Sequence, residues 1–216
     1  MKRLFLELRR KFKDLEINFT ELDNLPGKSV SLSATVQYLD LIPLVKKYLE
    51  SKGKKVITQK GAFHNCHVIG CNPAAMNPKA DCILLLADGK FHALNNAVFI
   101  KKEIYVFNTK SLEKVSKEDI NLKLNEIGAK RMKFLHSTKL GIIVSTKPGQ
   151  KFAAAKKLKQ QLAKKNKQAF IFQTDNINLA ELENFPDIEL WINTACPGLC
   201  FDDKRIVNLR DIQEFL

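Results

Sequence analysis

Residues 64–94, HNCHVIGCNPAAMNPKADCILLLADGKFHAL, hold three of the five cysteines and three of the four histidines of the chain. Within this stretch the apolar run 82–87 predicts a buried strand, and Asp88-Gly89 predicts the turn that ends it. Asn72-Pro73, directly after Cys71, is typical of the start of a helix. We therefore expect Cys71 and Asp88 in loops at one edge of a parallel sheet, where open α/β folds bind their ligands.

The cysteines of this stretch differ in what surrounds them. Cys82 lies inside the predicted strand, where a free cysteine behaves as a small apolar side chain, so we expect it in the core. Cys71 lies in a turn between Gly70 and Asn72, where a small apolar side chain has little to pack against. From spacing alone, a packing role for Cys71 and a role as ligand or nucleophile are equally open.

The composition is that of a globular protein with excess positive charge. Apolar residues make up 45% of the 216 positions, and no apolar run reaches the length of about 18 residues that a membrane span needs. The N-terminus mixes charges of both signs, unlike a secretory leader, so we expect a cytoplasmic protein with reduced cysteines. The net charge of +13 favours contact with a polyanion or an acidic partner, but surface lysines that aid solubility explain it equally well. We expect no sequence-specific nucleic-acid binding.

The first half of the chain predicts alternating strands and helices. Residues 1–22 carry apolar side chains at helical spacing, which predicts an amphipathic N-terminal helix. Strands are expected at 28–35, 55–58, 82–87 and 103–107, and a helix is expected around 41–48. This alternation is typical of a parallel sheet with helices on its faces.

The second half repeats this plan. A polar helical segment at 111–134 leads to strands at 140–145, 169–174 and 189–194, with a helix at 151–165 between the first two. We therefore predict an α/β fold with an N-terminal helix and linker at 1–24. Two similar parallel-sheet domains follow, at 25–115 with Cys71 and at 116–216 with Cys196.

Two further features leave alternatives open. The spacings Cys66-x4-Cys71 and Cys196-x3-Cys200 do not match a zinc knuckle, and thiolates from separate loops suit zinc or an iron–sulfur cluster alike. Seven lysines between positions 151 and 167 predict either a polyanion-binding helix or a solvated helix face. No P-loop, GxGxxG or nucleophile elbow is present, which disfavours an NTPase, a nicotinamide enzyme and a hydrolase of that kind.

A series of motifs follows the order of a known family. The motifs are Thr35-Val36-Gln37, Val68-Ile69-Gly70-Cys71-Asn72, Asp88-Gly89-Lys90-Phe91-His92-Ala93-Leu94, Thr146-Lys147-Pro148-Gly149-Gln150, Asn184-Phe185, Trp191-Ile192-Asn193-Thr194-Ala195-Cys196-Pro197 and Asp202-Asp203. Through most of its length the chain therefore resembles the archaeal and eukaryotic diphthamide synthase family.

The resemblance implies a radical transferase. Such an enzyme moves a 3-amino-3-carboxypropyl group from S-adenosylmethionine to a histidine of translation elongation factor 2. The family has three similar α/β domains, each of which gives one cysteine to a [4Fe–4S] cluster. Cys71 matches the cysteine of the second domain and Cys196 that of the third. Three thiolates leave one iron open, where the sulfonium can be held.

The same resemblance covers further residues of the site. It makes His92 and Asp88 candidate catalytic residues. It makes Gln37, Gly149 and Gln150 candidates for binding S-adenosylmethionine.

The chain departs from the family at its N-terminal side. It carries no counterpart of the first domain or of the first cysteine, and Gly198 stands where the family has a basic residue. We expect one of three arrangements. A separate chain supplies the missing domain in a homo- or hetero-oligomer; Cys66 or Cys200 supplies the third thiolate; or the chain is a non-catalytic partner subunit that binds no cluster.

Overall fold

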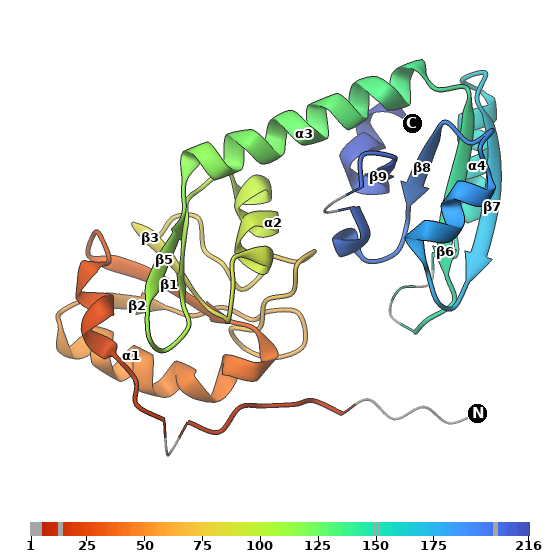
Figure 1. The fold of residues 1–216 in the computed structure, drawn as a ribbon. Coiled ribbons are helices and arrows are strands. Elements are labelled where there is room, and N and C mark those ends of the chain that lie inside the picture. The colour runs from red at the N-terminus through yellow and green to blue at the C-terminus, as the bar shows by residue number, and fades with distance from the viewer. Residues whose placement is uncertain (1–5, 13–14, 149, 151, 201–202) are drawn as a thin grey trace. The chain divides into compact units, whose positions relative to one another are not determined.

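The structure is a computed structural model of the chain and describes residues 6–12, 15–148, 150, 152–200 and 203–216 (Figure 1). The chain forms two compact units, Met1–Lys123 and Leu124–Leu216, each built around a sheet of its own. The predicted α/β class is therefore confirmed. No helix in the described ranges is long and apolar enough to cross a membrane.

The first unit holds a mixed sheet with the strand order β2-β1-β3-β4-β5. Its strands are β1 (Ser29–Ala34), β2 (Lys55–Ile57), β3 (Cys82–Leu86), β4 (Ile104–Phe107) and β5 (Leu112–Val115). The first four are parallel, and β5 pairs antiparallel with β4. The carboxyl ends of four strands therefore meet at one edge of the sheet.

The central strand β3 separates two halves of the core. All of its side chains are buried. The even-numbered ones pack with α1 (Ile42–Ser51), and the odd-numbered ones pack with α2 (Phe91–Ile100). Figure 1 shows these helices on opposite sides of the sheet. The apolar run that predicted β3 is therefore explained by burial on both faces.

The second unit holds an all-parallel sheet with the strand order β7-β6-β8-β9. Its strands are β6 (Lys139–Ser145), β7 (Gln168–Thr174), β8 (Leu190–Asn193) and β9 (Ile206–Asn208). One face is covered by α4 (Ala155–Ala163), whose Leu158 and Leu162 are buried. The order repeats that of the first four strands of the other unit, whereas the sequence predicted only a repeated alternation of strands and helices.

The other face of the second sheet is covered differently. Trp191, 2% exposed, packs against Phe172 and Phe185 with ring centroids 4.7 and 6.0 Å away. Its ring also lies on Gly141 of the neighbouring strand, where an added Cβ would stand 2.3 Å from Trp191 Cε3. The described covering elements are the 3-10 helices Leu179–Asn184 and Pro197–Cys200. Aromatic rings therefore cover this face of the sheet, whereas a helix covers the other.

An acidic residue fixes the same strand pair in each unit. The carboxylate of Asp81, directly before β3, accepts hydrogen bonds from the backbone N–H groups of Lys28 and Ser29 at the start of β1, both at 2.8 Å. Glu189, directly before β8, accepts from Thr138 N at 2.8 Å and from Lys139 N at 3.4 Å at the start of β6. These bonds satisfy backbone donors at the starts of the two strands.

A long helix, α3 (Lys117–His136), joins the units, and the division between them falls inside it, after Lys123. Its start is a capping box. Ser116 N donates to Asp119 Oδ2 at 2.9 Å, and Ser116 Oγ accepts from Asp119 N at 3.2 Å. This reciprocal pair satisfies donors at the helix terminus.

The predicted N-terminal helix is wrong over the described residues. Residues 6–12 and 15–18 have no helical structure, and a 3-10 helix begins only at Phe19–Asn24. Leu6 and Leu8 are 77% and 76% exposed, whereas Phe12 is 7% exposed, so the predicted apolar stripe does not pack as one helix face. A short helix without a packed face is not stable. Instead Phe12 is buried singly, and Arg10 N donates to Gln37 O at 3.0 Å.

Three smaller predictions also differ from the structure. No helix follows Asn72-Pro73, because Asn72 Oδ1 accepts from Ala74 N at 2.9 Å and closes a turn instead. In the segment predicted to be wholly helical, residues 112–115 form the antiparallel edge strand β5. Of the helix predicted at 151–165, the structure forms Ala155–Ala163.

Candidate functional site

The loop after β2 brings the cysteine-rich stretch back to the carboxyl edge of the first sheet. Ala34, the last residue of β1, donates its N–H to Cys66 O at 2.8 Å and accepts from Val68 N at 2.8 Å. Residues 66–68 therefore run beside β1 as a short parallel extension. This pairing places the following residues, including Cys71, at the edge where the sequence predicts them.

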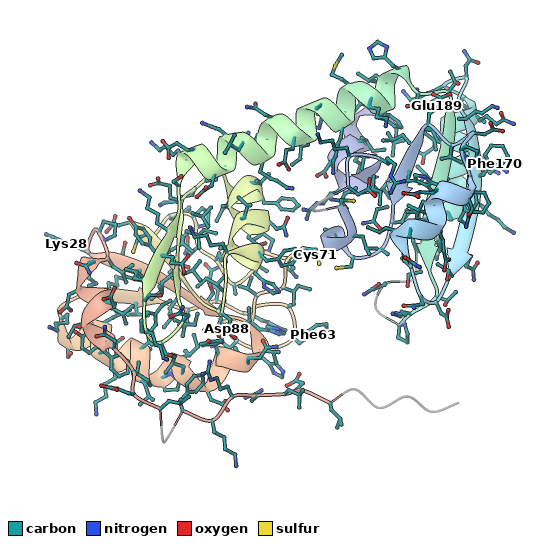
Figure 2. The ribbon with its side chains drawn as sticks, viewed as in Figure 1. Lys28, Phe63, Cys71, Asp88, Phe170 and Glu189 are labelled. Atoms are coloured by element: carbon teal, nitrogen blue, oxygen red, sulfur yellow. The ribbon has the colours of Figure 1, made fainter. Side chains whose placement is uncertain are left out.

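Cys71 lies at the tip of a tight turn and is exposed (Figure 2). The turn is closed by Asn72 N, which donates to Ile69 O at 3.1 Å. It also packs closely on α2, since a Cβ on Gly70 would stand 3.2 Å from Phe91 Cε1 and 3.8 Å from His92 Cδ2. A side chain larger than glycine would therefore push the Cys71 turn away from the helix.

Helix α2 holds the Cys71 turn through an amide. Asn96 Nδ2 donates to Ile69 O at 3.1 Å and to His92 O at 2.8 Å. His92, in the first turn of the helix, is half-buried. Burial is the first cause, and nearby His67 the second, of a lowered pKa for His92. His92 is therefore a neutral imidazole at pH 7, able to accept a proton beside the Cys71 turn.

Buried polar atoms without partners gather around this turn. His67 Nδ1, Asn95 Nδ2 and Asn96 Oδ1 have no hydrogen-bond partner within the described part of the chain. The side chains are 5%, 5% and 0% exposed. An unsatisfied buried polar atom costs about 1–3 kcal/mol. Such a cluster is typical of a binding site, where the ligand supplies the partners.

Asp88 is held by Tyr38 and by Arg10 of the N-terminal segment. Its carboxylate accepts a hydrogen bond from Tyr38 OH, and Arg10 Nη1 lies 3.4 Å from the same oxygen. Burial and then the bond to Asp88 raise the pKa of Tyr38 to about 12. Asp88 itself is 71% exposed, so one carboxylate oxygen is held while the group faces solvent.

Asn193 orders the loop of the second unit that carries Cys196. It is 2% exposed, and its Nδ2 donates to Cys196 O at 2.8 Å and to Asn208 Oδ1 at 2.9 Å. Its Oδ1 accepts from Ala195 N at 2.9 Å. Cys196 follows β8 at the carboxyl edge of the second sheet and is exposed.

The other cysteines lie in the interior. Cys66, Cys82 and Cys200 are 2%, 2% and 4% exposed. Burial raises the pKa of Cys66, that of Cys82 to about 11 and that of Cys200 to about 12. The Cys200 thiol also donates to Asn208 Oδ1 at 2.9 Å. These thiols stay protonated at neutral pH, whereas a metal ligand must be a thiolate.

The remaining predicted site residues are more scattered. Gln37 is exposed in the 3-10 helix Val36–Leu41, next to Tyr38. Gln150 is half-buried in the turn after β6, where its N donates to Lys147 O at 3.1 Å. Gly149 lies outside the described residues. Among the residues that the structure describes, no group of three or more His, Cys, Asp or Glu side chains forms a metal site.

Some residues of the candidate site carried no assigned role in the sequence. Asn193 stands inside the Trp191–Pro197 motif, and an amide directly after a predicted strand was a usable signal. His67 and Asn95 gave none, because their burial depends on contacts between distant segments.

A sequence model of the diphthamide synthesis protein family matches residues 1–206. The 2-(3-amino-3-carboxypropyl)histidine synthase of Pyrococcus horikoshii is 29% identical over 195 residues, covering 88% of this chain and 56% of the relative. The synthase of Methanocaldococcus jannaschii is 28% identical over 194 residues, covering 86% of this chain and 50% of the relative. Subunit 1 of the synthase from Caenorhabditis elegans is 25% identical over 205 residues, covering 88% and 51%.

Solved structures give the same match. The crystal structure of Dph2 from Pyrococcus horikoshii superposes with a TM-score of 0.80 at 27% identity, covering 91% of this chain and 59% of that one. A crystal structure of the same protein with a 4Fe–4S cluster gives a TM-score of 0.79 at 28% identity, with the same coverage. The chain thus spans about half the length of the curated relatives it matches.

Proposed function

This chain belongs to the diphthamide synthesis family, and from that premise we propose that it acts in the first step of diphthamide formation. The reaction transfers a 3-amino-3-carboxypropyl group from S-adenosylmethionine to a histidine of translation elongation factor 2. Relatives 28–29% identical to this chain are named as the synthase that forms this product. The chain itself is a transferase, alone or with a second chain.

Thiol exposure is the observation that carries the proposal. Of the five cysteines, only Cys71 and Cys196 are exposed. They are also the two that the family motifs match to cluster ligands. Buried cysteines act mostly as small apolar side chains, whereas an exposed thiol in a fixed loop is free to ligate.

The residues present fit an iron–sulfur cluster in part. Cys71 and Cys196 would each supply one thiolate, which is the ligand such clusters take. When bound and reduced, a [4Fe–4S] cluster supplies the electron that cleaves a carbon–sulfur bond of S-adenosylmethionine. The chain's own contribution is to fix each thiol on a short loop. Asn96 and Asn193 do this by bonding to backbone carbonyls of those loops.

His92 and Asp88 are the proposed catalytic residues. Burial lowers the pKa of His92, so its neutral imidazole can accept a proton beside the Cys71 turn. Asp88, held by Tyr38, presents its carboxylate to solvent, where it can orient the target histidine. Gln37, Gly149 and Gln150 are proposed to contact S-adenosylmethionine.

The third thiolate is proposed to come from a separate chain that supplies the family's first domain. The alternative source is Cys66 or Cys200, and their burial and raised pKa argue against both. Single Cys66→Ala and Cys200→Ala substitutions separate these sources. If either one abolishes cluster content while the protein stays folded, the third ligand lies in this chain.

A second candidate function is that of a non-catalytic partner subunit that binds no cluster. The observation that favours it is that the chain spans about half the length of the curated relatives it matches. Relatives named as subunit 1 show that family members occur as subunits.

Transfer of label tests the enzyme proposal. The full chain is reconstituted anaerobically, alone and with candidate partner chains, and mixed with elongation factor 2, a reductant and S-adenosylmethionine labelled in its carboxyl group. We expect label in elongation factor 2 that is lost with Cys71→Ala. Transfer that survives both Cys71→Ala and Cys196→Ala would contradict the proposal. No transfer with any partner would favour the non-catalytic subunit.

A further inference from the structure

One edge of the second sheet is open. β7 pairs with β6 along its whole length and ends the strand order, so no described strand pairs with its other side. Gln168 N donates to Thr138 O at 2.8 Å, and Thr174 O accepts from Thr146 N at 2.9 Å. Because parallel pairing uses every second residue of a strand, the odd-numbered residues of β7 point their backbone groups away from the sheet. These residues are Ala169, Ile171 and Gln173.

The open edge lacks the features that usually block the pairing of edge strands. Such strands are commonly protected by a proline, a charged side chain or a bulge. β7 reads QAFIFQT, with neither a charge nor a proline, and its register with β6 is unbroken. Phe170 and Ile171 are 39% and 37% exposed. An unprotected apolar edge of this kind can accept a further strand.

The two sides of this edge differ in chemistry. Side chains alternate along a strand, so Phe170 lies on the same side as Phe172, which packs against Trp191. Ile171 lies on the same side as Ala169, which packs in the core beneath α4. An added strand would therefore meet aromatic rings on one side and α4 on the other.

The α4 side of the edge is basic. Between Glu126 and Asp175 the sequence has no acidic residue. The apolar residues of α4 are buried against the sheet, so its lysines lie on the solvent side of the helix, which Figure 1 shows beside β7. The exposed lysines in and just after α4 are Lys156, Lys157, Lys159, Lys164 and Lys165. Glu181 and Glu183 belong to the 3-10 helix on the opposite face of the sheet.

Charge and backbone together select the occupant of this edge. A second copy paired through its own β7 would bring two basic α4 helices together, and like charges repel. A nucleic acid would suit the lysines but cannot continue the backbone pairing of the sheet. An extended peptide segment pairs with the open backbone, and acidic side chains on its α4 side match the lysines.

We propose that the open edge of β7 binds an extended segment of a protein partner in which acidic and apolar side chains alternate. The segment adds a strand to the second sheet, with its acidic side chains towards α4 and its apolar side chains beside Phe170. This inference is independent of the proposed transferase reaction. It assigns the lysine-rich stretch to a binding surface instead of a merely solvated helix face.

Hydrogen exchange of the full chain, followed by NMR, tests the added strand. The probe is a designed peptide as long as β7 in which Glu and Val alternate. We expect it to slow exchange at the amides of Ala169, Ile171 and Gln173 about tenfold or more. Phe170 and Phe172 should change less, because the pairing already directs their N–H groups to β6. A peptide with Lys in place of Glu should have no effect. Unchanged exchange with the Glu peptide would overturn the proposal.

Removal of charge from α4 tests the role of the lysines. The variant carries Gln at the exposed positions Lys156, Lys157, Lys159 and Lys164. Exposed ion pairs are individually weak, so we expect the four changes together to weaken binding of the Glu peptide about tenfold or more. The matched control makes the same change of charge in the first unit, at exposed Lys47, Lys60, Lys79 and Lys110. Equal losses in both variants would reduce the effect to net charge and contradict the site.

A proline in β7 tests the role of the backbone. Gln173→Pro removes one outward N–H group, and an edge strand tolerates proline where that group faces solvent. Trp191 fluorescence during urea unfolding verifies the fold. We expect Gln173→Pro to weaken binding of the Glu peptide about tenfold, whereas Gln173→Thr, which keeps the donor, should bind as wild type does. Equal binding by the two variants would contradict the added strand.

Two further measurements identify the other occupants. Slowed exchange at the same amides without peptide, growing with protein concentration, would show that a second copy pairs at the edge. A single-stranded RNA oligonucleotide that binds more tightly than the Glu peptide at physiological salt, and loses that binding in the four-lysine variant of α4, would show a nucleic-acid surface. We expect neither result, and either would overturn the proposal.

Discussion

The two units share a strand order but place their exposed cysteines after different strands. In the first unit Cys71 follows β2, whereas in the second Cys196 follows β8, the counterpart of β3. The position that corresponds to Cys196 is taken in the first unit by Asp88. The repeated sheet therefore fixes the edge at which chemistry can occur, and the loop that supplies the reactive group is free to differ.

The units also differ in how their sheets are covered. The first has an α-helix on each face, and the second has α4 on one face and the Trp191 aromatic cluster on the other. In both, one acid before a central strand holds the start of its neighbour. The two units therefore share hydrogen bonds to backbone N–H groups and differ in their side-chain packing.

The largest expected effect is the contrast in thiol reactivity. With iodoacetamide at pH 8, Cys71 and Cys196 should react rapidly, because they are exposed. The pKa of Cys200 is about 12, so only about one molecule in ten thousand carries the reactive thiolate at that pH. Mass spectrometry of peptides gives the rates, with the urea-unfolded chain as control. Equal rates at Cys200 and Cys196 in the native chain would contradict this contrast.

The aromatic face of the second unit should tolerate no added atom at Gly141. A Cβ there would stand 2.3 Å from the ring of Trp191, and such overpacking costs about 1–3 kcal/mol. Urea unfolding followed by the fluorescence of the single tryptophan measures it. The matched control is Gly128→Ala in α3, where an added Cβ meets nothing within 4 Å, and we expect it to stabilise by about 0.5–1 kcal/mol. Unchanged stability of Gly141→Ala would show that the Trp191 ring packs loosely on this face of the second sheet.

The hydrogen bonds that Asp81 and Glu189 accept at the strand starts should make both units sensitive to acid in the same way. Backbone N–H donors lower the pKa of Asp81 and of Glu189 below their ordinary values of 3.8 and 4.5. Each bond therefore stabilises the fold at pH values above the ordinary pKa of its carboxyl group. This stabilisation is lost as the pH falls through the lowered pKa.

Substitution of Asp81 and of Glu189 tests these hydrogen bonds directly. We expect Asp81→Asn and Glu189→Gln each to lower thermal stability at pH 7, by less than Gly141→Ala does. Each should also reduce the further loss of stability between pH 5 and pH 2. Asp187→Asn, at a side chain 85% exposed, should change little. If only one of the two substitutions lowers thermal stability, the repeated hydrogen bonds do not stabilise both units.

The smallest expected effect concerns Asp88 at the edge of the first sheet. Tyr38, with a pKa of about 12, should ionise well above the ordinary value of about 10 for tyrosine in an ultraviolet titration. Asp88→Asn should lower the pKa of Tyr38 and leave it above 10, because burial is the larger cause. Asp40→Asn, which removes the partner of Arg9, serves as the control. An unchanged titration in Asp88→Asn would contradict the hydrogen bond between Tyr38 and Asp88.

The sequence predicted well the elements whose own residues decide them. The apolar runs at β3 and β6 reflect strands whose side chains are buried on both faces of a sheet. The edge strand β5 was missed because Leu, Glu and Lys favour helices, and pairing with β4 overrides that preference. The capping box at Ser116 and Asp119 marked where the helix really begins.

The site was predictable only where a motif carried it. Cys71 and Cys196 stand in motifs and lie in exposed loops, as predicted. The N-terminal helix was wrong because Leu6 and Leu8 are exposed and only Phe12 is buried, which periodicity alone does not report. The burial of His67 depends on neighbours distant in sequence, so local patterns gave no sign of it.

Iron and acid-labile sulfide per chain show whether Cys71 and Cys196 both ligate a cluster. They are measured after anaerobic reconstitution, with and without a family partner chain, for wild type, Cys71→Ala, Cys196→Ala and the buried-cysteine control Cys82→Ala. We expect a cluster in wild type and in Cys82→Ala that is lost in both other variants. A full cluster in Cys71→Ala and Cys196→Ala, or no cluster in wild type under either condition, would contradict it.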